Sequence, residues 1–306
     1  MIDIYKRSLK DLELIKLKKI EKGSWISVIN PNIDEIEKLE KKLHLDLTVI
    51  EDALDENEIS RIEESNNIFY FIIRFPVQSD LNATTIPLLI VITKDNIITL
   101  CKDNNDLIKK IIRKQESCFT THKTRFLLKI IIEAFNSYDS NLKRILKDIK
   151  IKKIKIKNLE NKDILFLVQE EETLNDFVSS IVPIISNLER ILSGRFVPIF
   201  EKDRDIIEDL FMDSKQTLEI SRTALKSIRN IREAYSTILT NDLNKIMKVL
   251  TVVTITLTVP TIISSVYGMN IKLPMQNNPF AFVYIVIIIL LLSILLLTIL
   301  KKKRWI

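Results

Sequence analysis

The residues best placed to do chemistry are hydroxyl side chains inside an apolar stretch. Val249 to Val266 holds 18 residues without a formal charge, yet five threonines and two serines interrupt it. Steps of three and four residues, the spacing of one helix face, join Asn244, Met247, Thr251, Thr254, Thr258, Thr261 and Ser265. Such a stripe is suited to line water. Alternatively, the hydroxyls bond back to carbonyls one turn earlier or pack against another helix, and the pattern leaves both interpretations open.

A second group of candidate ligands is acidic. Asp203, Asp205, Glu208, Asp209 and Asp213 fall within a few helical turns, with residues 205, 209 and 213 one turn apart. Carboxylates near a helix N-terminus are favoured by the helix dipole, so a solvated acidic face is the ordinary interpretation. Mg²⁺ also prefers oxygen ligands, so a metal site is the alternative interpretation.

Several classes of function find no support. We see no glycine-rich phosphate loop, no Ser/His/Asp or Cys/His constellation and no CxxC pair, so an enzyme is not expected. The net charge of +6 is spread along the chain, which argues against nucleic acid as a partner. The acidic segment 34–64 lacks the spacing of an EF-hand loop. We expect the basic run 150–158 to be a solvated helix face, and residues 1–20 contain no signal-peptide core.

Two segments are long and apolar enough to cross a bilayer. Phe280 to Leu300 has 21 residues without a charge, which at about 1.5 Å per residue covers the roughly 30 Å hydrocarbon layer. Val249 to Val266, extended by its flanks, crosses as well, with a kink expected at Pro260. Together they predict an antiparallel hairpin.

The basic residues around the hairpin predict its orientation. Lys245 and Lys248 precede the first span, and 301–304 directly follow the second, whereas the connecting loop 268–279 has Lys272 alone. The positive-inside rule then places both chain ends in the cytoplasm. Two helices cannot shield a hydrophilic path from lipid, so a pore requires several copies around an axis.

A very long helix is expected before the membrane. From Ile199 to Val259 there is neither Gly nor Pro, and apolar residues keep a three-four spacing into the first span. We predict one helix of about 60 residues, about 90 Å long. Such a helix can carry a change at its cytosolic end to the membrane without a flexible joint.

The N-terminal part reads as an α/β domain. Strands are predicted at 24–29, 68–75, 87–93 and 97–100, and helices at 34–44, 106–114, 125–157 and 163–192. The fold class is therefore an α+β membrane protein with a cytosolic α/β domain. We divide the chain into that domain at 1–200, a stalk helix at 201–248, a first transmembrane helix at 249–267, an external loop at 268–279, a second transmembrane helix at 280–300 and a basic cytosolic tail at 301–306.

Tyr267-Gly268-Met269-Asn270 directly follows the first span, and here the chain resembles the CorA family of magnesium channels, whose hallmark is a Gly-Met-Asn tripeptide at that place. The resemblance is supported by NKIMKVLT at 244–251, the ending KKKRWI at 301–306, and IEDAL at 50–54 followed by Arg-Ile-Glu at 61–63. With the order of elements, it covers essentially the whole chain.

The resemblance implies a funnel-shaped homopentamer in the cell membrane, with the first span lining the pore. The residues that it places on the channel are Asn244, Met247, Leu250, Thr254, Thr258, Thr261 and Ser265. Met247 and Leu250 would form a hydrophobic constriction, and Gly268, Met269 and Asn270 the external mouth. Asp209 matches a cytosolic carboxylate that binds regulatory Mg²⁺ between subunits. We further expect Gly268 to adopt a left-handed turn that ends the helix.

The external loop departs from the family pattern. Many members carry Met-Pro-Glu-Leu there, whereas 271–278 contains no acid, so a ring of external glutamates is unavailable. The expected function is Mg²⁺ influx gated by cytosolic Mg²⁺, with the ion as cargo and regulator and no other cofactor. The alternatives are transport of Zn²⁺ or of Co²⁺ and Ni²⁺, as in the related ZntB-type proteins, or a membrane-anchored metal sensor that does not conduct.

Overall fold

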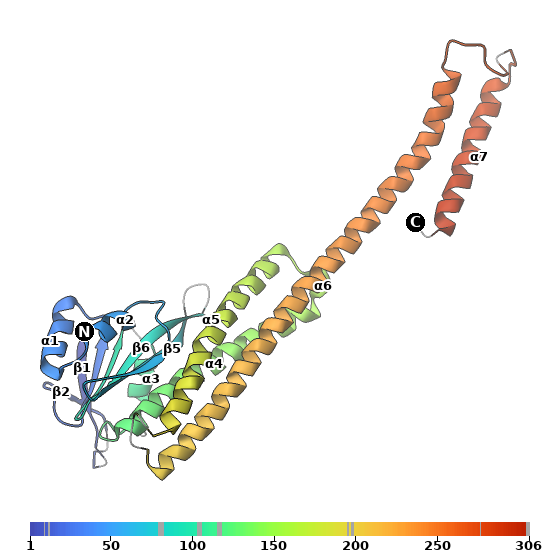
Figure 1. Cartoon of the computed structure of the whole chain (residues 1–306). Coiled ribbons are helices and arrows are strands. Elements are labelled where there is room, and N and C mark those ends of the chain that lie inside the picture. The colour runs from blue at the N-terminus through green and yellow to red at the C-terminus, as the bar shows by residue number, and fades with distance from the viewer. Residues whose placement is uncertain are drawn as a thin grey trace. The chain divides into compact units, whose positions relative to one another are not determined.

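The structure is a computed structural model of the whole chain (Figure 1), and it divides into two compact units, Met1–Ile231 and Arg232–Ile306. It describes residues 1–303 other than 9, 12, 79–82, 103–105, 115–117, 195, 197, 198 and 276, and for residue 202 the backbone only. The end of the predicted basic tail, residues 304–306, lies outside the described residues.

The first unit is built on a seven-stranded sheet with the order β2-β1-β3-β7-β6-β5-β4. The strands are β1 (Ile2–Lys6), β2 (Ile15–Leu17), β3 (Trp25–Ile29), β4 (Arg61–Ser65), β5 (Ile68–Gln78), β6 (Ala83–Ile92) and β7 (Ile97–Cys101). Only β3 and β7 pair in parallel, with Trp25 opposite Ile97, and the other neighbours are antiparallel. The central strands are apolar on both faces, as expected for a sheet covered on both sides.

Two short helices cover one face of the sheet. α1 (Ile33–Leu43) begins with a capping box in which Asn32 and Glu35 satisfy each other's backbone N–H groups, and α2 (Leu47–Ala53) begins at the Asp46 cap. Ile36 and Leu39 of α1 and Ile50 of α2 join a buried cluster with alternate residues of β3, β5, β6 and β7.

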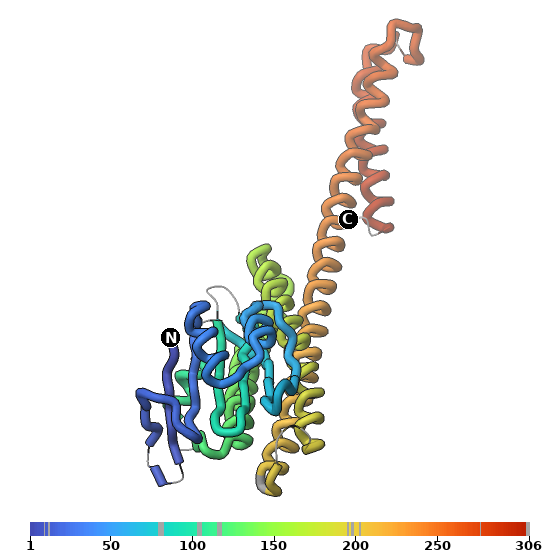
Figure 2. The backbone as a smooth tube through the Cα atoms, turned by 60° about the vertical axis from the view of Figure 1, so that its left-hand side comes forward, coloured from blue at the N-terminus to red at the C-terminus, as the bar shows by residue number. Residues whose placement is uncertain are grey.

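Longer helices cover the opposite face. These are α3 (Asp106–Arg113), α4 (Lys123–Ile154) and α5 (Asn161–Leu192). A short 3₁₀ turn at Ile156–Asn158 joins α4 to α5. Trp25 packs against Phe126 of α4 in a tilted arrangement with ring centroids 5.0 Å apart, and Tyr138 of α4 meets Phe177 of α5 edge-on at 5.0 Å. Figure 2 lets the reader follow the sheet between these two helical layers.

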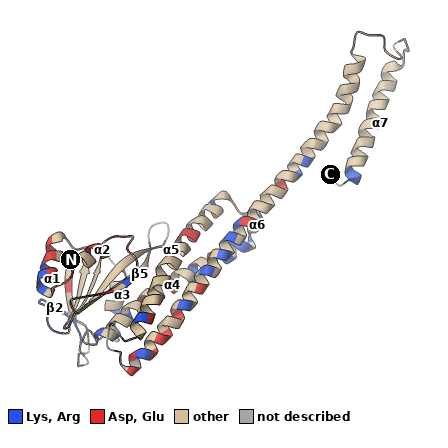
Figure 3. Ribbon diagram, in the orientation of Figure 1, with Lys and Arg blue, Asp and Glu red and all other residues tan. Residues whose placement is uncertain are grey.

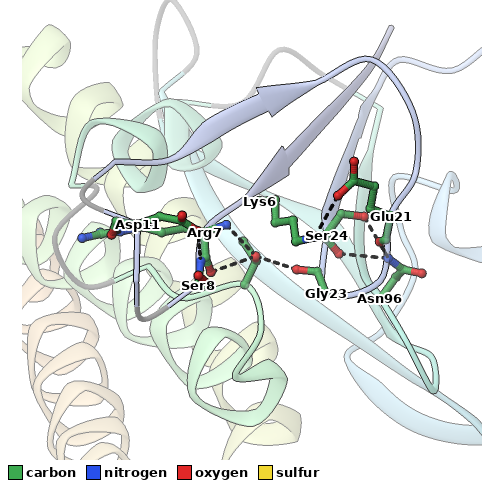
Figure 4. Close-up of polar contacts among 9 residues, drawn as sticks. Lys6, Arg7, Ser8, Asp11, Glu21, Gly23, Ser24 and Asn96 are labelled. Carbon is green, nitrogen blue, oxygen red and sulfur yellow. Dashed lines mark hydrogen bonds and ion pairs between the residues drawn. The ribbon is translucent and has the colours of Figure 1, made fainter.

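The turn before β3 is held by buried polar contacts (Figure 4). The Thr120 hydroxyl donates to the Gly23 carbonyl at 2.7 Å and accepts from the Arg7 backbone N–H at 3.0 Å. Gly23 has φ +80°, and a Cβ there would lie 3.0 Å from the Thr121 methyl, so both conformation and space require glycine. Asn96 donates to the Glu21 carbonyl at 2.6 Å, which ties this turn to β7.

The first part of α6 (Glu201–Tyr267) belongs to the same unit. Its buried side includes the small residues Ser214, Ser221 and Ala224, which allow close helix packing. Asp203 pairs with Arg125 at 3.3 Å, and the Thr217 hydroxyl bonds to Asp139 of α4 at 3.3 Å. Thr217 follows Asp203 by 14 residues in α6, and Asp139 follows Arg125 by 14 residues in α4. The two helices therefore run parallel.

The second unit contains the rest of α6 and α7 (Ala281–Lys302). Both helices are long and apolar enough to cross a membrane, by length and composition. Figures 1 and 2 show them running side by side in opposite directions, and Figure 3 shows charged residues only toward the lower ends of this hairpin, apart from the loop.

The predicted fold class is confirmed, and the predicted long helix is present as 67 residues. The helices predicted at 34–44, 106–114, 125–157 and 163–192 and the four strands are also present, with shifted ends. Strands β1, β2 and β4 and helix α2 were not predicted. The basic run at 150–158 is the end of α4 and the 3₁₀ turn rather than a strand, and Lys150, Lys153 and Lys155 are exposed.

Candidate ion pathway and metal-binding residues

The predicted hydroxyl stripe lies on one exposed side of α6. Thr254, Thr258, Thr261 and Ser265 are all exposed in the chain. Each of the three threonines donates its hydroxyl proton to the carbonyl four residues earlier, at 2.9, 2.8 and 2.8 Å. The hydroxyls therefore satisfy themselves on their own helix and need no polar partner from another one. Their oxygens keep free lone pairs on the exposed side.

The opposite side of α6 is the one that α7 covers. Within the hairpin Val252 is 5% exposed, and Thr256, Val259 and Ile263 are half-buried. The less exposed residues of α7 form one face of that helix. They are Ala281, Ile285, Ile289, Ser293, Leu296 and Leu300. At about 100° per residue, Val252 and Thr254 point about 160° apart around the helix. The stripe consequently faces away from its only neighbour in the hairpin.

The stripe continues toward the cytosolic end of the predicted span. Met247 and Leu250 are 57% and 56% exposed, and Asn244 is exposed as well. By helical position Leu250 lies within about 40° of Thr254. Thr251 lies at the border of the stripe and is half-buried, with its hydroxyl bonded to the Met247 carbonyl at 2.8 Å.

The helix ends at Gly268, but not in the way predicted. The Gly268 N–H donates to the carbonyls of Ser264 at 2.9 Å and Ser265 at 3.2 Å. Its φ does not lie in the left-handed region, so the expected left-handed turn is wrong. A Cβ would instead lie 3.3 Å from the Ser264 oxygen and 3.5 Å from the Ser265 oxygen, so glycine is favoured here by close approach to carbonyls.

The loop after Gly268 places the predicted mouth residues at the end of the hairpin. The Met269 N–H bonds to the Val266 carbonyl at 3.3 Å, and both Met269 and Asn270 are exposed. Further on, the Asn278 side chain accepts from the Phe280 N–H at 2.9 Å at the start of α7. This local turn was not predicted, although an Asn just before an apolar run is a recognisable turn signal. Asn270 makes no hydrogen bond to another residue of the described chain, so its amide is available to a ligand.

The acidic cluster at the start of α6 is split by the fold. Asp203 is buried against Arg125, and Glu208 pairs with Arg204 of its own helix at 3.3 Å. Asp205, Asp209 and Asp213 are exposed. Among the described residues no three acidic, His or Cys side chains are grouped closely enough to hold a metal ion. Within the described residues Asp209 thus has no second and third carboxylate, His or Cys beside it with which to share a metal ion.

Comparison with known proteins assigns this architecture to a class. A soluble α/β unit, one helix continuing into an apolar span, and a second apolar helix define a class of two-span membrane proteins. Residues 21–302 match the family described as CorA-like Mg2+ transporter protein. The chain belongs to that family, a family of transporters, and it carries the Gly-Met-Asn tripeptide at the end of the first span.

Individual relatives agree with this assignment. The chain is 28% identical over 298 residues to the cobalt/magnesium transport protein CorA of Methanocaldococcus jannaschii, covering 92% of this chain and 91% of that one. The complete structure of the CorA magnesium transporter from the same organism superposes with a TM-score of 0.88 at 24% identity, over 100% and 99% of the two chains. Full-length CmaX shares the fold at TM-score 0.74 and 12% identity, covering 99% of this chain and 97% of CmaX.

Proposed function

We propose that this protein is a subunit of an oligomeric membrane channel for divalent metal ions, with Mg²⁺ as the principal cargo. The observation that carries the proposal is the hydroxyl stripe of α6, which faces away from α7 and leads to the Gly268-Met269-Asn270 tripeptide. The hydroxyl oxygens keep free lone pairs on this side, so copies of the same helix that turn it toward a common axis would give that axis a polar wall shielded from lipid. A ring of copies then encloses an axial path, and five copies are expected from the family resemblance.

The residues along this path have distinct proposed roles. Met247 and Leu250 narrow the cytosolic end with apolar side chains, which can close a pore by expelling water. Asn270 and the Gly268 backbone supply neutral oxygens at the external mouth. Mg²⁺ sheds its octahedral water shell reluctantly, so amide and carbonyl oxygens suit the hydrated ion because they accept hydrogen bonds from its waters.

Charge and voltage favour influx in this arrangement. Lys245 and Lys248 precede the first span, and the lysines at the end of α7 follow the second. By the positive-inside rule we propose that both chain ends lie in the cytoplasm. A divalent ion moving down a potential of 100 mV gains about 4.6 kcal/mol. Cytosolic Mg²⁺ closes the channel by binding Asp209 together with ligands of a neighbouring subunit.

The test is flux through the purified protein in liposomes, measured for one metal at a time. We expect Mg²⁺ to enter and Asn270→Ala to abolish entry while the oligomer remains intact by size-exclusion chromatography. The matched control is Asn277→Ala, which removes the same side chain from the same loop. Wild-type flux in the Asn270 variant would remove the tripeptide from the mechanism.

Co²⁺ is the second candidate cargo. The relative in Methanocaldococcus jannaschii is called a cobalt/magnesium transport protein, and the acid-free loop 271–278 offers no fixed charge with which to select among divalent ions. Flux of Co²⁺, Ni²⁺ or Zn²⁺ above that of Mg²⁺ would reassign the cargo. An intact oligomer that conducts none of these ions would instead support a metal sensor.

A further inference from the structure

A cavity of about 330 Å³ lies in the soluble unit, and its lining includes residues from the start of α4, the β6–β7 turn and the start of α6. It is far in sequence from the pore stripe, and the proposed transport does not use it. Its volume is within the range of small-molecule sites, about 300–1,000 Å³.

The cavity is lined by an excess of positive charge. Lys94, Lys123 and Arg125 face one carboxylate, that of Asp203, which Arg125 already neutralises at 3.3 Å. Lys94 is exposed and makes no ion pair within the described chain. Positive groups on the low-dielectric walls of a cleft concentrate the field and attract anions.

The start of α4 adds a favourable dipole on the same side. α4 begins after His122, whose side chain does not cap the helix. The dipole of this long helix favours negative charge at its N-terminal end. The Lys123 ammonium donates to the carbonyls of Thr93 and Lys94 at 2.6 and 2.7 Å, and burial lowers its pKa. A bound anion would offset that burial.

The remaining wall is apolar and partly aromatic. Phe69, Ile92 and Phe200 line it, and Phe200 has 66% of its surface exposed. An exposed phenylalanine beside the unpaired Lys94 is poorly explained by packing, because it gains little from burial in the chain alone. A planar ring stacked on it would cover that surface.

We propose that this cavity binds a nucleoside monophosphate, with the phosphate at Lys94, His122 and the start of α4 and the base against Phe200. Simple phosphate would use the cationic side only, and a neutral nucleoside the aromatic side only. Because Phe200 and Asp203 adjoin the first turn of the pore-forming helix, an occupant would join α4 to the start of α6. The cavity is thus a site through which a nucleotide regulates the proposed channel.

The experiment uses the full-length protein in detergent with EDTA and radiolabelled AMP in equilibrium dialysis. AMP is chosen because it holds Mg²⁺ weakly, so binding is separated from metal chelation. We expect saturable binding at one site per chain, at least about tenfold tighter than that of adenosine or inorganic phosphate, because each supplies half of the contacts.

Variants locate the site. Phe200→Ala and the double change Lys94→Gln with His122→Gln should each weaken AMP binding by about tenfold or more. All three side chains are exposed, so the fold should survive, which the thermal midpoint checks. Lys19→Gln is the control, since Lys19 is an exposed lysine of the same unit outside the cavity. Light-activated 8-azido-AMP should label a peptide that contains residue 122 or 200.

Three results would overturn the proposal. The first is no AMP binding at millimolar concentration. The second is AMP binding that the Phe200 and Lys94/His122 variants leave unchanged, and the third is equal affinity for AMP and inorganic phosphate, which would make the cavity a plain anion site. None of them bears on metal flux, so failure here leaves the proposed transport untouched.

Discussion

Val252 and Thr254 lie two residues apart on α6 and point to nearly opposite sides of it. Val252 is 5% exposed against α7, whereas Thr254 is exposed and bonds only to the carbonyl of Leu250 at 2.9 Å. The hairpin therefore has an apolar side that it covers itself and a hydroxyl side that it leaves to other molecules. Thr256 and Thr258 repeat this relationship one turn later.

This relationship predicts different effects for two identical substitutions. Thr258→Val removes a hydroxyl oxygen from the proposed path, and we expect metal flux in liposomes to fall by about tenfold because an apolar wall dewets more readily. Thr256→Val removes the same group from the side toward α7 and should leave flux within about twofold of wild type. Equal loss in both variants would contradict the assignment of the pore face.

Asp209 gives a prediction about gating. Asp209→Ala should leave transport intact but raise the internal Mg²⁺ concentration needed for half inhibition by about tenfold or more, because a charged ligand is lost. Glu219→Ala is the control, since Glu219 is an acid of the same helix that pairs with Arg222 at 2.7 Å. Flux measured against internal Mg²⁺ gives both curves, and unchanged inhibition in the Asp209 variant would place the regulatory site elsewhere.

A side chain at Gly268 is expected to disturb the end of α6. In Gly268→Ala the new methyl would meet the Ser264 carbonyl at 3.3 Å, so the end of α6 must shift and carry Asn270 with it. We expect flux to fall on the order of tenfold while the oligomer still forms. Ser264→Ala, which changes a neighbouring side chain without crowding that carbonyl, should conduct normally. A fully active Gly268 variant would show that the tight approach is not needed.

Glu133 predicts a dependence of stability on pH in the soluble unit. Its side chain is 2% exposed and accepts from Lys114 at 2.9 Å and from Lys129 at 3.2 Å. Burial alone would raise the pKa of the carboxyl, but the two ammonium donors outweigh burial and hold the pKa below its ordinary value of 4.5. The stabilisation is therefore complete above about pH 4.5 and is lost as the pH falls through the lower, folded-state pKa.

Glu133→Gln should destabilise the soluble unit by about 2 kcal/mol near neutral pH, a value kept modest because Lys114 is 55% exposed. Thermal unfolding followed by circular dichroism should show a lower midpoint, and its difference from wild type should shrink in acid. Glu37→Gln breaks only the exposed pair with Lys41 and should have little effect at any pH. A Glu133 variant as stable as wild type at pH 7 would contradict the argument.

The elements predicted correctly are those with a strong local pattern. The helix through 201–267 was predicted because neither Gly nor Pro interrupts it before Pro260, and the helix continues through that proline. β1 was missed because IDIYK mixes charged and aliphatic residues, and β4 because RIEES is polar. Both strands depend on their neighbours: Ile4 pairs with Ile26, and Ile62 with Phe71. Such tertiary pairing outweighs local propensity.

Only part of the candidate site could be predicted, because some of its features depend on contacts between elements rather than on local sequence. The stripe follows from helical spacing, which sequence gives directly, whereas its direction depends on which side α7 covers. Gly268 was predicted to need a positive φ because that is the usual reason for glycine at a helix end, but here close carbonyls are the reason. The role of Asp209 depends on a second subunit, which one chain cannot supply.

In the stripe of α6, Thr254, Thr258 and Thr261 each donate the hydroxyl proton to the backbone of their own helix. These hydroxyl groups therefore turn lone pairs rather than protons toward the proposed path. A hydrated cation presents water hydrogens on its outside and would match such a surface, whereas an anion would find fewer donors there. In the proposed channel a preference for cations would then follow from the orientation of the threonine hydroxyls, since 249–266 contains no carboxylate.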